Sequence, residues 1–433
     1  MLFLVVDSQI SIIADIIVSQ IVSFWGIALF VMISAVYVVG QYLILEMIKA
    51  RIRESKTKPP LLDMTEKFVT AIQYVLATIT IIAVIEVLAM VAYHTDLLVV
   101  TTTISYGLVI ILMGFLTWRL LSWFKINKSL IVLLYGLAAA TIIINSVATV
   151  LFFDLVLLEK PDLTTPESEV IFDTGYEPGT LKEIIVQVQG YSFPAFLLLI
   201  WGGSIILLRN NIYRIGKIKF GALVTFPILY WFAYYIFLYP TIYPDSPITQ
   251  AIDENFMVSL LLYNGAGIVT GILFGLGFLS IARFIPSGND VRDYMNIAGY
   301  GFMIFGTAGI TTVLQAAYPP YGLPNVSFVG LAAFLILVGL HHSAVSVAHD
   351  VRLRQFIKNS ALKEAKLLDG MASAQMAQDL LKKIMTVTKE NAYVMEQQSG
   401  TEPSLTEKDM AGYIERILHE IKQKKDTTSV DNK

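Results

Sequence analysis

The sequence predicts an all-α, polytopic membrane protein with about nine transmembrane helices and a C-terminal cytoplasmic helical tail. The chain is 55% hydrophobic and only 15% charged over 433 residues, whereas an ordinary soluble domain carries about 25% charged residues. Its mean hydropathy is +0.66. Nearly uncharged runs of about 18 or more residues recur along the first 350 positions, and each is long enough to cross a hydrocarbon core of about 30 Å.

The apolar runs divide the chain into a membrane domain, residues 1–350, and a tail, residues 351–425. The loop 159–190 is the one long connection inside the membrane domain, and residues 426–433 are expected to be disordered. No basic segment precedes the first apolar stretch, so no removable signal peptide is expected. The nine expected spans are 16–48, 67–93, 97–118, 129–156, 191–208, 220–240, 258–282, 294–317 and 327–349.

The loops between the spans sort by charge. The basic ones are 49–58, 119–128, 209–219 and 283–292. On the other side, the loop 159–190 carries two lysines against seven carboxylates, and the loops 243–257 and 319–326 carry no Lys or Arg. Short loops rich in Lys and Arg stay in the cytoplasm. The sequence therefore predicts a cell-membrane protein with its N-terminus outside and its C-terminus in the cytoplasm.

Several polar and aromatic side chains fall inside the expected spans, mostly in their outer halves. An ionised carboxylate at the bilayer centre costs about 2.5–3.5 kcal/mol on insertion scales, so such groups usually face the interior of a helix bundle. Two interpretations stay open for them, contact with a bound ligand and helix packing. The ligand-binding candidates are Glu86, Asn145, Asp154, Trp231, Tyr234, Tyr235 and Asn264.

The seventh span contains a stripe of small residues. Gly267, Gly271 and Gly275 recur at intervals of four in "NGAGIVTGILFGLG". Glycines spaced in this way remove the side chains from one helix face and let a neighbouring backbone approach closely. Tight packing between helices is the expected role of the stripe, with a homodimer contact as the alternative.

Three of the five histidines lie at the inner end of the ninth span, in "VGLHHSAVSVAHD". His94 lies at the outer end of the second span, so the bilayer thickness separates it from the other three and they cannot share a haem. No cysteine is available to complete a zinc site, and no metal or cofactor is predicted. His342, His349 and Asp350 are instead expected to form a transmission joint between the membrane domain and the tail.

The tail is predicted to be a series of amphipathic helices. Apolar residues recur at helical spacing through Met376, Leu380, Ile384 and Val387, and Ser404 with Glu407 forms a capping box for a last helix. The tail has no phosphate-binding glycine loop and no basic helix-turn-helix, so neither an enzyme nor a nucleic-acid partner is expected. The expected partner-binding face of the last helix is Met410, Ile414, Ile417, Leu418 and Ile421.

The motifs "SVAHDVRLRQFIKNSA", "LLDGMASAQMAQDLL" and "EPSLTEKDMAGYIERIL" follow an N-out membrane domain. In this respect the chain resembles a group of uncharacterised multi-spanning membrane proteins of ammonia-oxidising archaea. That resemblance covers the whole chain layout and implies no activity and no catalytic residues. Seven helices followed by a cytoplasmic helix also resemble, more loosely, the membrane sensor modules of bacterial histidine kinases, although no kinase domain follows here.

These observations favour a membrane sensor or adaptor. Its outward-facing membrane domain would be coupled to cytoplasmic helices that bind a partner protein, in the cytoplasm or in the membrane. A structural or assembly subunit of a larger membrane complex is the alternative, and a small-molecule transporter is a weaker one because no pair of interrupted helices is evident. The lipid bilayer is the one partner that composition alone predicts.

Overall fold

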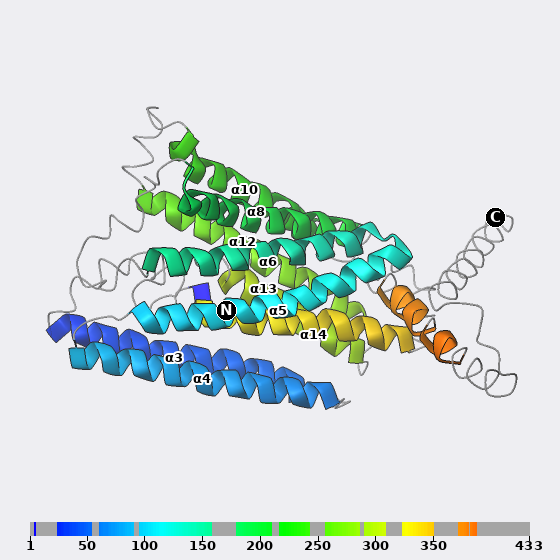
Figure 1. The fold of residues 1–433 in the computed structure, drawn as a ribbon, viewed down its shortest axis with the longest axis horizontal. Helices are drawn as coiled ribbons and strands as arrows, with labels where there is room; N and C mark the ends of the chain where they lie inside the picture. The colour runs from blue at the N-terminus through cyan, green and yellow to red at the C-terminus, as the bar shows by residue number, and fades with distance from the viewer. Residues whose placement is uncertain are drawn as a thin grey trace, which may run out of the picture.

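The computed structural model describes residues 4–5, 24–53, 60–90, 95–157, 179–209, 216–242, 256–285, 290–308, 323–349, 371–380 and 382–387 (Figure 1). Almost all of these residues are helical, and none of them belongs to a strand. The prediction of an all-α protein is confirmed for this part of the chain.

Each predicted span overlaps one long helix. The helices are α3 (Phe24–Arg53), α4 (Pro60–Met90), α5 (Thr95–Asn127), α6 (Leu130–Leu157), α8 (Leu181–Leu208), α10 (Lys217–Ile242), α12 (Phe256–Phe284), α13 (Asp290–Ala308) and α14 (Leu323–His349). Two further stretches, 371–380 and 382–387, are helical and belong to the tail.

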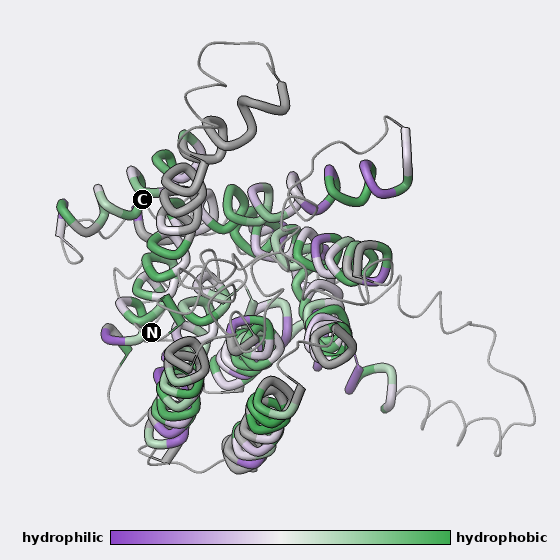
Figure 2. Tube along the Cα trace, turned by 90° about the vertical axis from the view of Figure 1, so that its left-hand side faces the viewer, coloured by the Kyte–Doolittle hydropathy of each residue, from purple (hydrophilic) through white to green (hydrophobic). Residues whose placement is uncertain are grey.

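Four stretches are long and apolar enough to cross a membrane by length and composition: Val99–Asn127, Leu130–Phe152, Leu181–Ile206 and Asn325–Ala348. Hydrophobic residues, green in Figure 2, run along the described helices. Large apolar side chains are also exposed, among them Tyr74, Ile104 and Ile111. Soluble monomers rarely expose contiguous apolar surface of this kind. These four helices are therefore candidate membrane-spanning helices.

Seven of the described helices form one bundle in chain order. Each of α5, α6, α8, α10, α12, α13 and α14 packs on the next, and α14 packs back on α5 to close the arrangement. Ser105 of α5 donates a hydrogen bond to the Val326 carbonyl of α14 at 2.5 Å across this closure. The hairpin of α3 and α4 lies outside the bundle (Figure 1), where Phe68 of α4 packs on Phe334 of α14 with 4.1 Å between ring centroids.

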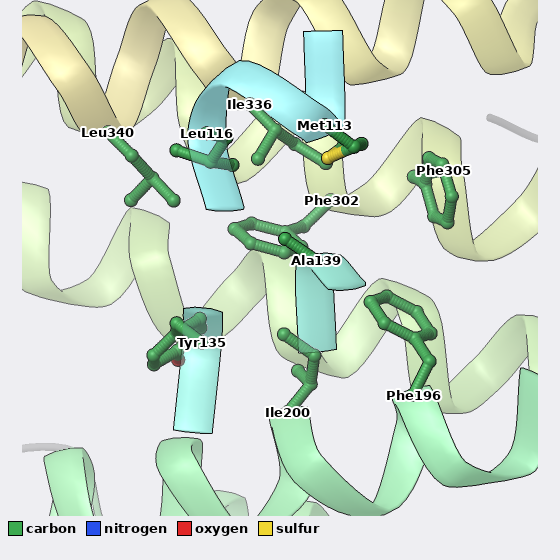
Figure 3. A pocket seen from close by; sticks show the side chains of 10 residues that line it. All are labelled: Met113, Leu116, Tyr135, Ala139, Phe196, Ile200, Phe302, Phe305, Ile336 and Leu340. Atoms are coloured by element: carbon green, nitrogen blue, oxygen red, sulfur yellow. The ribbon is translucent and has the colours of Figure 1, made fainter. Parts of the chain in front are cut away.

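Apolar side chains fill the axis of the seven-helix bundle. Tyr135, Phe278 and Phe302 meet there from three helices, with 4.7 Å between the stacked rings of Phe278 and Phe302. A cavity of about 20 Å³ remains beside them (Figure 3), which is room for about one water molecule. The hydroxyl of Tyr135 is engaged with Ser204 Oγ at 3.2 Å. The axis is a packed core.

Helix α13 lies between α12 and α14 with almost no side chain separating the backbones. A Cβ added to Gly271 of α12 would lie 2.3 Å from Gly306 Cα, and one added to Gly275 would lie 2.5 Å from the Gly299 carbonyl oxygen. On the other face of α13, a Cβ on Gly339 of α14 would lie 2.5 Å from Ala298 N. Glycine is required at these positions because backbone atoms occupy the space of a side chain.

Helix α8 begins at Leu181, well before the predicted start of the fifth span at residue 191. The cause is a capping box in "TLKE". The Thr180 hydroxyl accepts a hydrogen bond from Glu183 N, and Glu183 Oε2 accepts one from Gly179 N at 2.6 Å. The end of the expected loop 159–190 is therefore helical, and the part before residue 179 lies outside the described residues.

Candidate functional site

The tail helix 371–380 packs on the end of the bundle at which α5 and α14 finish, called here the Trp123 end (Figure 1). Met371, Ala372 and Ala374 of this helix are fully buried, and Gln375 is also buried. Small side chains at 372 and 374 let the tail helix approach closely, as alanine does at helix interfaces. The tail is thus seated on the bundle by its least bulky face.

Trp123 of α5 makes the polar contact with the tail. Its indole Nε1 donates a hydrogen bond to Gln375 Oε1 at 3.1 Å, and Gln375 Nε2 donates to Asp379 Oδ1 at 2.9 Å. Both Trp123 and Gln375 are buried. A buried indole N–H needs an acceptor because an unpaired donor away from water costs about 1–3 kcal/mol. The pairing therefore fixes which tail residue faces the bundle.

Stacked rings continue this contact into the membrane-spanning helices. The imidazole of His341 in α14 stacks on Trp123 with 6.0 Å between centroids and 17° between planes. His342 lies edge-on to His341 at 4.9 Å, and Tyr294 of α13 lies 5.5 Å from His342. One continuous set of side chains therefore links α13, α14, α5 and the tail. No third metal-ligating side chain within the described residues joins the two histidines.

Charged groups surround this set of rings on two sides. Arg119 of α5 lies over the rings of Phe115 and Trp118, with Cζ 5.6 and 5.3 Å from their centroids. At the start of α13, burial and then the negative charge of Asp293 raise the pKa of Asp290 above its usual value. Asp290 Oδ1 is buried without a hydrogen-bond partner.

Asn145 bridges two helices. Its Nδ2 donates to the Gln189 carbonyl at 3.1 Å and to Ser192 Oγ at 3.0 Å, both on α8. Gln189 Nε2 donates in turn to Thr149 Oγ1 at 3.2 Å. Because Asn145 donates its two amide hydrogens to acceptors on α8, these contacts favour helix packing over ligand binding as the role of Asn145.

The other ligand-binding candidates are not gathered into one site within the described residues. Asp154 is half-buried near the end of α6, and Trp231 is partly buried in α10 beside Tyr230, with 6.4 Å between their centroids. Further candidates lie in described helices but have side chains outside the described part: Glu86, Tyr234, Tyr235, Asn264, Gly267 and His349. Asp350 and the partner-binding face Met410, Ile414, Ile417, Leu418 and Ile421 lie wholly outside the described residues, as do residues 426–433.

The sequence interpretation missed Trp123 and Gln375. Trp123 lies in "LLSWFKINKSL", where a tryptophan before a basic turn is typical of an interfacial aromatic. In the tail, the residues with the clearest helical periodicity are Met376, Leu380, Ile384 and Val387, of which Ile384 is half-buried and the other three are exposed. The signal that was present is the small-residue run "MASA" at 371–374, which suits close helix packing.

Comparison of the chain with protein-family models, curated proteins and solved structures finds no match. The functional argument therefore depends on the geometry of the Trp123 end.

Proposed function

We propose that the protein is a multi-pass membrane sensor or adaptor in which the seven-helix bundle controls the cytoplasmic tail helices. The observation that carries the proposal is the contact of Trp123 with Gln375, which joins a bundle helix to the tail through a buried hydrogen bond. The stacking of His341 on Trp123 supports it because a movement of α14 relative to α5 would disturb the same contact. Such a protein signals by changing the population of docked and released tail.

The proposed topology has nine spans, with the N-terminus outside and the C-terminus in the cytoplasm. The charge of the loops supports it, since Arg51, Lys125, Arg214 and Arg283 all lie in loops assigned to one side. Helices α5 and α14 finish at the same end, where the tail packs (Figure 1). This arrangement requires the Trp123 end to face the cytoplasm.

Epitope tags test this topology. A tag in the loop 159–178 should be reachable by antibody on intact cells, whereas tags at 211–215 or after residue 425 should be reachable only after permeabilisation. The same tag at all three positions makes each site a control for the others. A C-terminal tag that is reachable on intact cells would contradict the proposed orientation.

The tail presents an apolar stripe for a partner. Met376 and Leu380 are 44% and 45% exposed and lie on one side of the helix 371–380, away from the buried residues Met371 and Ala374, and Val387 of the stretch 382–387 is 47% exposed. An exposed apolar stripe on a water-facing helix is a docking surface for another protein. Met376 and Leu380 belong to the same helix as Gln375, so docking of the tail on Trp123 sets where they are presented.

Co-purification in mild detergent tests the partner surface. We expect a protein that co-purifies with the native chain to be lost when Met376→Asp and Leu380→Asp are combined, because two carboxylates cannot be buried in an apolar contact. The matched control is Lys382→Asp with Lys383→Asp, which adds two carboxylates to exposed polar positions of the neighbouring tail stretch 382–387. A stoichiometric complex that survives the stripe change would favour the alternative, a structural subunit held through the membrane domain.

A transporter is the less favoured alternative because of the bundle axis. Its cavity of about 20 Å³ is lined by apolar groups from α5, α6, α8, α13 and α14. A transported polar solute needs polar groups along its path, as the broken helices of secondary transporters provide. The packing of Phe278 on Phe302 at 4.7 Å instead fills this part of the axis.

A further inference from the structure

Two buried nitrogen atoms near the Trp123 end lack hydrogen-bond partners. Nε of Arg119 in α5 and Nε2 of His341 in α14 are both shielded from solvent and have no hydrogen-bond partner within the described part of the chain. An unpaired charged donor away from water is more costly than a neutral one. A missing acceptor is therefore expected beside the Arg119 guanidinium.

Arg119 and His341 lie against the same aromatic ring. Arg119 Cζ is 5.6 Å from the centroid of Phe115, and the His341 ring is 5.8 Å from that centroid. Arg119 is the permanently charged member of this pair because a guanidinium is not deprotonated in proteins. The site therefore carries a positive charge that suits an anion.

Arg119 and His341 lie near the position at which uncharged helical sequence gives way to charged sequence. In α5, residues 97–118 carry no charge and Arg119 is the next charged residue after Asp96. In α13, the uncharged stretch begins at Tyr294, directly after Asp293, and Tyr294 packs on His342 at 5.5 Å. Two helices, α5 and α13, thus change from uncharged to charged sequence beside this site, and such a boundary is typical of the level of lipid headgroups.

Exposed aromatic side chains border the site. Phe115 and Trp118, which flank Arg119, are among the exposed large apolar residues of α5. Aromatic rings at this level are typical of the membrane interface, where they pack against acyl chains and the headgroup region. A ligand that reaches Arg119 between these two rings must itself combine an apolar part with an anionic group.

We propose that Arg119 and His341 bind the phosphate of an anionic phospholipid headgroup. The guanidinium donates from Nε and its terminal nitrogens to the phosphate oxygens, in the forked geometry that suits arginine and phosphate. His341 donates from Nε2 to a further oxygen, and the acyl chains lie along Phe115 and Trp118. Because His341 also stacks on Trp123, the lipid site and the tail contact share one side chain.

Lipid titration of the purified full-length protein in neutral detergent tests this site. Native mass spectrometry would compare dioleoylphosphatidylglycerol with dioleoylphosphatidylcholine, and thermal shift would include inorganic phosphate as a third probe. We expect phosphatidylglycerol to bind at least about tenfold more tightly than phosphatidylcholine. Arg119→Gln and His341→Gln should each weaken phosphatidylglycerol binding about tenfold or more, as expected for loss of a charge-assisted hydrogen bond.

Two further variants separate the site from general charge and from misfolding. Lys125→Gln removes an exposed positive charge from the same helix and should leave the lipid preference unchanged. Arg119→Lys keeps the charge without the fork and should retain part of the affinity. Equal binding of the two lipids, or an unchanged preference in Arg119→Gln, would overturn the site. Stabilisation by inorganic phosphate equal to that by phosphatidylglycerol would overturn the lipid as its ligand.

Discussion

Replacement of Gly271 by alanine is expected to destabilise the bundle strongly. The new Cβ would lie 2.3 Å from Gly306 Cα, so α12 and α13 must separate because a backbone atom cannot rotate out of the way. Overpacking of a well-packed contact costs about 1–3 kcal/mol, and the backbone clash places this variant toward the upper end. The midpoint of thermal unfolding in mild detergent, followed by size-exclusion chromatography, measures the loss.

Gly265→Ala is the matched control, since it lies on the same helix and its added Cβ would meet nothing within 4 Å. Alanine is favoured over glycine in a helix by about 1 kcal/mol, so this variant should be as stable as the native chain or more stable. Gly306→Ala should resemble Gly271→Ala, and the double variant should cost less than the sum because both changes open one contact. Equal unfolding midpoints for Gly265→Ala and Gly271→Ala would contradict the close approach of α12 and α13.

The helices and their order were predictable because a bilayer imposes a simple rule on sequence. A span needs about 20 mostly apolar residues, and each of the nine expected spans does overlap one described helix. The ends were less predictable because they depend on local hydrogen bonds. Helix α8 starts at Leu181 because Thr180 and Glu183 cap it. A search for uncharged runs places the start later, because it excludes the charged residues Lys182 and Glu183.

The polar candidates show what hydropathy alone leaves open. Asn145 and Asp154 lie on one helix and have similar polarity, yet Asn145 is buried between α6 and α8 with two acceptors whereas Asp154 is half-buried. The difference arises from which face of α6 meets α8, and a helix that is apolar on all sides gives no periodic signal for that face. Partners of intramembrane polar residues therefore follow from the packing of the helices and not from depth.

The tail shows the same difficulty. Periodicity draws attention to Met376, Leu380 and Val387, whereas the buried residues are Met371, Ala372 and Ala374. Close packing against a bundle favours small side chains, which hydrophobic scales rank below Leu and Met. The interpretation of the ninth span as a transmission joint was drawn from His342, His349 and Asp350, and in the structure the contact to the tail passes through His341 and Trp123.

Trp123→Ala is expected to release the tail from the bundle. Trp123 is 0% exposed, so its truncation removes the stacking partner of His341, the donor to Gln375 and the side chain that fills the space between α5 and the tail. Truncation of a buried tryptophan costs about 3–5 kcal/mol. Hydrogen exchange of the backbone amides in residues 371–387 should accelerate at least about tenfold, which corresponds to about 1.4 kcal/mol of lost docking free energy.

Ile111→Ala supplies the matched control for this release, because it truncates a large apolar residue on the same helix at a side chain that is 70% exposed. It should leave the exchange of 371–387 unchanged.

A finer test isolates the hydrogen bond between Trp123 and Gln375. Trp123→Phe and Gln375→Leu should each accelerate exchange of the tail amides, since each leaves one buried polar group unpaired. The double variant should recover part of the lost docking free energy. Unchanged tail exchange in Trp123→Ala would remove the contact that carries the proposed coupling, and the structural-subunit alternative would then be the better account of this bundle.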